Sequence, residues 1–127
     1  MAIGTARIGR DRYRTDIDLG SHRLVADEPA VLGGQNDGPA PYELLLASLG
    51  ACTAITLRMY ADRKGWAMTS VEVELQWRRE EDGPRIVRTL RPQGLDAQQR
   101  QRLVDIAERT PVTLTLLGGV SIDTFVA

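Results

Sequence analysis

Cys52 is the residue of this chain best suited to nucleophilic chemistry, and it is the only cysteine among 127 residues. A thiolate attacks electrophilic atoms when a cation or a helix N-terminus stabilises its negative charge. The alternative interpretation is a buried, inert thiol that fills space in the core. One cysteine excludes an intramolecular disulfide, and with His22 as the only histidine it argues against a Cys/His zinc site. We therefore expect neither a metal nor a cofactor.

The cations that could stabilise a Cys52 thiolate come from distant parts of the sequence. Arg58 is the nearest, but its offset of six residues places it almost on the opposite side of a helix. The N-terminal segment is rich in arginines, and three of them alternate at period two, so they share one face of a strand. The sequence leaves open which of the three faces the thiol: Arg10, Arg12 or Arg14.

Glu43 is the only carboxylate in the first two turns of the helix that carries Cys52. It precedes Cys52 by nine residues, so the two side chains lie about half a turn apart on a straight helix. A bend or a partner chain would be needed to bring them together. The other interpretation of Glu43 is a favourable interaction of its carboxylate with the helix N-terminus.

The segment Pro41–Lys64 predicts a helix about 36 Å long, with proline at its first position and Gly65 just past its end. No charged residue occurs from Leu44 to Leu57, and a helix that is apolar on all sides is buried on all sides. This charge-free segment is too short to span a membrane. Because 127 residues offer limited cover, we expect a second copy to supply the rest, as an obligate homodimer. Small residues that permit close approach of another helix form a row: Ala47, Gly50, Ala51 and Ala54.

The remaining elements predict short strands before the helix and a hairpin, a helix and a last strand after it. Asp96 is expected to cap the second helix, with Gln99 as its capping-box partner and Leu103, Val104, Ile106 and Ala107 as its buried stripe. Val112–Leu117 is short and apolar. This order predicts a single α+β domain over residues 1–127 with mainly antiparallel pairing. The expected strands are 2–8, 12–19, 22–26, 71–78, 85–91 and 120–126.

The composition argues against a nucleic-acid-binding protein and against an exported one. Sixteen basic and seventeen acidic residues give a net charge of −1, whereas nucleic-acid binders more often carry a basic surplus. The first residues contain no apolar core of a signal peptide, so a cytoplasmic location is expected. We expect no nucleic-acid partner and no membrane.

Several motifs around Cys52 resemble the superfamily of osmotically inducible protein C (OsmC) and organic hydroperoxide resistance proteins. The likeness covers nearly the whole chain and implies an α+β fold in which two chains intertwine around central long helices. The motifs are Gly33-Gly34, Gly38-Pro39, Pro41 with Glu43-Leu44-Leu45, Leu49-Gly50-Ala51-Cys52, Tyr60-Ala61 and Lys64-Gly65-Trp66.

The resemblance implies a catalytic set. In the family, a cysteine on the central helix attacks the peroxide O–O bond, and an N-terminal arginine held by a glutamate stabilises the thiolate. Cys52 matches the cysteine and Arg10 is the nearest match to the arginine. The usual position of the glutamate holds Tyr42, and Glu43 lies one residue later. Thr110 occupies the position of the family's second, resolving cysteine, so the two-cysteine cycle cannot operate.

Three functions remain open. The first is reduction of an organic hydroperoxide in oxidative-stress defence by Cys52 alone, with an external thiol as reductant. The alternative is a non-catalytic homodimer of the same fold that binds a small hydrophobic ligand. The third is a thiol that serves only core packing. The sequence does not identify the substrate or the reductant.

Overall fold

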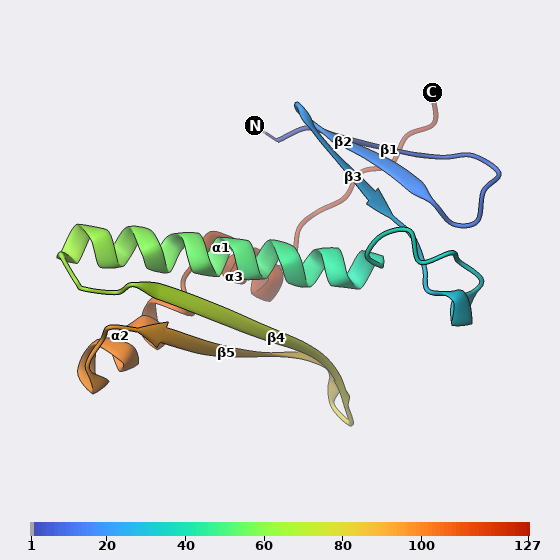
Figure 1. Ribbon diagram of the computed structural model, residues 1–127. Coiled ribbons are helices and arrows are strands. Elements are labelled where there is room, and N and C mark those ends of the chain that lie inside the picture. The colour runs from blue at the N-terminus through green and yellow to red at the C-terminus, as the bar shows by residue number, and fades with distance from the viewer. Residues whose placement is uncertain (1) are drawn as a thin grey trace. The chain divides into compact units, whose positions relative to one another are not determined.

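The computed structural model describes residues 2–127 and divides into two compact units, Met1–Leu45 and Leu46–Ala127 (Figure 1). Its helices and antiparallel strands confirm the α+β class. The elements are, in order, β1 (Gly4–Ile8), β2 (Thr15–Leu19), β3 (His22–Ala26), a short 3-10 turn (Ala30–Leu32), α1 (Pro41–Lys64), β4 (Ser70–Glu80), β5 (Gly83–Gln93), α2 (Ala97–Ala107) and α3 (Pro111–Gly118).

The N-terminal unit holds a three-stranded antiparallel sheet in the order β1-β2-β3. The loop after β3 is organised by Asp27, which is only 2% exposed. Burial raises the pKa of Asp27, but its hydrogen bonds from backbone N–H groups outweigh this effect and hold the pKa below its usual value. The donors are the N–H groups of Tyr13, Glu28, Gln35 and Asp37, at 2.9, 2.7, 3.3 and 3.1 Å.

Helix α1 has the bounds that the sequence predicts, Pro41–Lys64. Its buried residues form one stripe at a spacing of four: Leu49, Thr53, Leu57 and Ala61. The expectation of burial on all sides is wrong for one chain, because Ile55 and Met59 are 54% and 58% exposed. The helix is also long and apolar enough to cross a membrane by length and composition, but a single helix of this kind is weak evidence for a span.

The hairpin of β4 and β5 lies along α1 in the C-terminal unit (Figure 1). The predicted alternation is confirmed in β4, where Val71, Val73, Leu75 and Trp77 are less exposed than Glu72, Gln76 and Arg78. Leu57, Ala61, Met68 and Leu103 form the core, and the side chains packed around it are Tyr60, Trp66, Val71, Leu90, Leu95 and Ile106.

Two expectations about the C-terminal region hold and two differ. The capping box of Asp96 and Gln99 opens α2 as predicted. Leu103 and Ala107 are buried, but Val104 of the expected stripe is 41% exposed. The short apolar segment is the helix α3.

The expected strand at 120–126 is absent from the described structure, where these residues have no regular secondary structure. A strand needs a neighbouring strand to receive its backbone hydrogen bonds, and none of the strands among residues 2–127 pairs with the segment. Its large apolar residues are exposed: Val120, Ile122, Phe125 and Val126.

Candidate active site around Cys52

Cys52 lies on α1 in the C-terminal unit and is half-buried. The backbone N–H of Val112 donates a hydrogen bond to its Sγ at 3.5 Å. Val112 is the second residue of α3, so the thiol lies against the N-terminus of that helix. Free N–H groups and the helix dipole make such an end favourable for negative charge. The middle of α1 offers Cys52 no free N–H group. The N-terminus of α3 does.

The start of α3 is held by a buried cluster of hydroxyl groups. Thr110 is fully buried, and its Oγ1 lies 2.6 Å from Oγ1 of Thr113. Thr113 also donates to the carbonyl oxygen of Ala107 at 3.2 Å. A hydroxyl carries one hydrogen, so Thr110 must be the donor in the bond between the two threonines. The hydroxyl of Thr110 therefore donates its hydrogen to Thr113.

Arg88 reaches this cluster from β5. Its guanidinium donates to Oγ1 of Thr53, to Oγ1 of Thr113 and to the carbonyl oxygen of Ala107, each at 2.9 Å. Burial lowers the pKa of Arg88, while the negative charges of Glu108 and of a Cys52 thiolate oppose that shift. A cation is thus within electrostatic reach of the thiol.

The other two candidates from the sequence belong to the N-terminal unit. Arg10 is exposed in the turn between β1 and β2. Glu43 is exposed in the first turn of α1, and its Oε1 accepts a hydrogen bond from the N–H of Ala40 at 2.9 Å. Glu43 therefore caps the helix, as its alternative interpretation suggested. Of the three predicted residues, only Cys52 belongs to the C-terminal unit.

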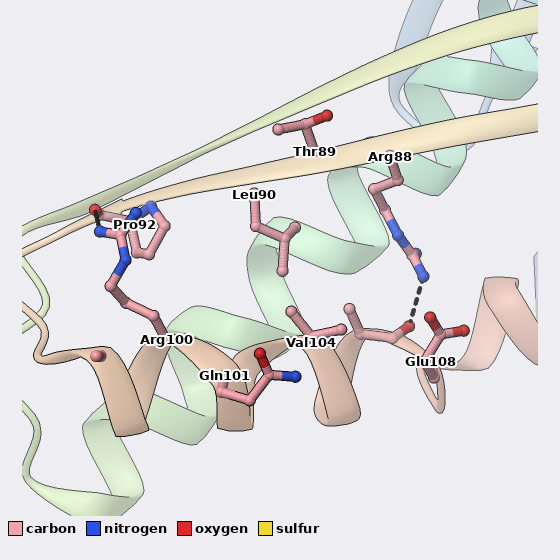
Figure 2. A pocket seen from close by; sticks show the side chains of 10 residues that line it. Arg88, Thr89, Leu90, Pro92, Arg100, Gln101, Val104 and Glu108 are labelled. Carbon is pink, nitrogen blue, oxygen red and sulfur yellow. Dashed lines mark hydrogen bonds between the residues drawn. The ribbon is translucent and has the colours of Figure 1, made fainter.

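A groove of 460 Å³ lies beside Arg88, between β5 and α2 (Figure 2). Leu90, Pro92 and Val104 give it apolar walls. Figure 2 shows Arg88 and Arg100 near opposite ends, where they donate to the carbonyl oxygens of Ala107 and Pro92. This size is typical of sites for small organic molecules.

This arrangement suits a nucleophilic thiolate that is half-exposed and supported by an N–H group and a guanidinium. In the part of the chain that the structure describes, no group of three His, Cys, Asp or Glu residues could hold a metal ion.

Sequence reasoning missed Arg88 and the N-terminus of α3. The signal for Arg88 is its place between Ile86 and Leu90 at period two, which puts a cation on an otherwise apolar strand face. The signal for α3 is Pro111 at a first helical position ahead of an apolar run. Neither pattern tells which residue the cation or the helix end will meet.

Comparison with known proteins finds one matching family. A family described as OsmC-like protein matches residues 34–125, well over half of the chain. No curated protein matches it significantly.

Solved structures of similar fold include an OsmC-like protein from Mycoplasma pneumoniae, with TM-score 0.74 and 19% identity over 93% of this chain and 88% of that one. The organic hydroperoxide resistance protein OsmC of Legionella pneumophila has TM-score 0.68 and 24% identity, over 93% and 90%. The organic hydroperoxide resistance protein OhrB of Bacillus subtilis has TM-score 0.64 and 26% identity, over 93% and 91%.

Proposed function

The chain belongs to the OsmC-like protein family, and on that premise we propose that it reduces organic hydroperoxides in oxidative-stress defence with Cys52 as its single redox-active thiol. The observation that carries the proposal is the hydrogen bond from the N–H of Val112, at the start of α3, to Sγ of Cys52. It stabilises a thiolate, which is the form that attacks a peroxide. The 26% identical protein of Bacillus subtilis is named for resistance to organic hydroperoxides, which supports a hydroperoxide as the substrate.

The proposed reaction begins when the Cys52 thiolate attacks the terminal oxygen of a hydroperoxide. The O–O bond breaks, the alkoxide takes up a proton and leaves as an alcohol, and the sulfur becomes a sulfenic acid. An external thiol then attacks the sulfenic sulfur and releases water, which leaves a mixed disulfide. A second thiol reduces that disulfide and restores Cys52. The external thiols replace the resolving cysteine, because the hydroxyl of Thr110 cannot form a disulfide.

Arg10 and Glu43 complete the proposed catalytic set by resemblance. Arg10 would stabilise the thiolate, with Arg12 and Arg14 as alternatives, and Glu43 would hold the arginine. Glu43 has a second task, since its carboxylate already caps α1 through the N–H of Ala40.

The test compares the wild-type protein with Cys52→Ser. Purified protein is incubated with cumene hydroperoxide and either a dithiol or a monothiol, and the remaining peroxide is measured. We expect consumption that depends on both Cys52 and thiol. Equal, negligible consumption by the two proteins with both reductants would overturn the proposal.

We further propose that the protein is a homodimer, soluble and cytoplasmic. Ile55 and Met59 form an exposed apolar stripe on α1 together with Ala51, and a second copy would remove this stripe from water. Sedimentation of the wild type should give twice the chain mass, and Ile55→Glu should shift it to the monomer. A wild-type protein that sediments as a monomer at micromolar concentration would contradict the dimer.

A second candidate function is non-catalytic binding of a small hydrophobic ligand. The groove between β5 and α2 favours it, since Leu90 and Val104 line a space large enough for such a molecule. Native mass spectrometry of the protein purified from cells should then detect a retained small molecule. A Val104→Arg variant, which fills the groove, should lose it. Peroxide turnover without any retained ligand would favour the enzyme.

A further inference from the structure

Arg88 stands on the side of the β4–β5 hairpin that packs against the core. It pairs with Leu75 across the hairpin, and its neighbours at period two, Ile86 and Leu90, are partly buried apolar residues. Moving a guanidinium from water to such a face costs free energy unless hydrogen bonds hold it. Arg88 therefore depends on its hydrogen bonds to offset the cost of leaving water.

The hydrogen bonds of Arg88 connect three helices. Thr53 belongs to α1, Ala107 is the last residue of α2, and Thr113 lies in the first turn of α3. All three acceptors are neutral oxygen atoms, so the bonds satisfy the donors without cancelling the positive charge. The remaining charge acts on whatever ionisable group lies near it.

Two ionisable groups lie near it, Glu108 and Cys52, and Cys52 is the proposed nucleophile. Thr53 is the next residue along α1, and Thr113 is the next residue after Val112, whose N–H donates to Sγ. The guanidinium thus holds both segments that bring the N–H and the sulfur together. The guanidinium of Arg88 is also close enough to Cys52 for an electrostatic interaction with the sulfur.

We propose that Arg88 is a positioning residue for Cys52: its bonds to Thr53 and Thr113 keep the N-terminus of α3 against the sulfur, and its charge favours the thiolate. The inference rests on the proposed function, because it concerns the same nucleophile. It assigns to β5 a cation that acts on the thiol in addition to the N-terminal arginine of the proposed catalytic set.

The test measures alkylation of Cys52 by iodoacetamide as a function of pH, which requires no peroxide turnover. The variants are Arg88→Met, Arg88→Lys and the control Arg85→Met, which removes an exposed arginine from the same strand. In Arg88→Met the rate of alkylation at neutral pH should fall several-fold, because the N–H of Val112 and the positive charge no longer support the thiolate. Arg88→Lys should recover part of that rate, and Arg85→Met should behave as the wild type.

Circular dichroism tests whether each variant is folded. A folded Arg88→Met that is alkylated at the wild-type rate across the pH range would overturn the proposal. If Arg88→Met does not fold, Thr113→Val decides, because it removes one acceptor of Arg88 and keeps the charge. Its alkylation rate at neutral pH should fall several-fold, and an unchanged rate would overturn the proposal. If the wild-type protein consumes no peroxide but Arg88→Met still slows alkylation of Cys52, the proposed function is contradicted and the positioning role of Arg88 is not.

Discussion

The change Thr110→Cys should convert the protein into a two-cysteine enzyme. Thr110 is fully buried at the start of α3, two residues before the N–H that donates to Cys52. Cysteine is close to threonine in size, so the reduced variant should fold and lose only the hydrogen bond to Thr113, about 1 kcal/mol of stability. One equivalent of hydroperoxide should then form a disulfide between Cys52 and the introduced thiol.

The expected stabilisation follows from the length of the loop that this disulfide closes. A loop of about 60 residues corresponds to about 4 kcal/mol from restriction of the unfolded chain. After subtraction of the lost hydrogen bond, the oxidised variant should be about 3 kcal/mol more stable than the wild type. For a chain of this length, that raises Tm by about 10 °C.

Thiol counting and thermal unfolding provide the assay. Treatment with hydroperoxide should leave Thr110→Cys without free thiols, because both form the disulfide. The control is Thr115→Cys, which places a thiol on the exposed part of α3 and should lose only the Cys52 thiol. If Thr110→Cys keeps one free thiol after oxidation and its Tm does not rise, Thr110 does not occupy the resolving position, and the reasoning is wrong.

Three further predictions concern stability and the cap of α1. Asp27→Asn should destabilise the protein at pH 7; because the pKa of Asp27 is lowered in the fold, the difference from the wild type is full above about pH 4 and closes as the pH falls further. Urea unfolding at pH 7 and pH 3 measures this, and the exposed Asp16→Asn should not reproduce it. Glu43→Gln keeps the acceptor that caps α1, so its urea midpoint should stay at the wild-type value while peroxide turnover falls; unchanged turnover would remove Glu43 from the catalytic set. Leu57→Ala, at a fully buried position, should cost about 3 kcal/mol in the free energy of unfolding, and a cost below about 1 kcal/mol would contradict the assigned core.

Local signals in the sequence determined much of the fold. Pro41 and Gly65 mark the ends of α1, and Asp96 with Gln99 marks the start of α2, because each cap is satisfied by backbone groups a few residues away. The alternation from Val71 to Arg78 determined the hairpin strand for the same reason, since a period of two depends only on neighbouring residues. Cys52 could likewise be singled out by its type and its place in an apolar helix.

Only the tertiary structure decided what surrounds that cysteine. Val112 meets the thiol from 60 residues further along the chain, and Arg88 approaches from another strand. Such contacts depend on how α1, β5 and α3 pack together, which no local spacing encodes. The error at 120–126 has the same origin, since an alternating segment becomes a strand only where another strand accepts its hydrogen bonds. The sequence therefore singled out Cys52 as the candidate nucleophile, whereas the fold brought the N-terminus of α3 and the Arg88 guanidinium close to it.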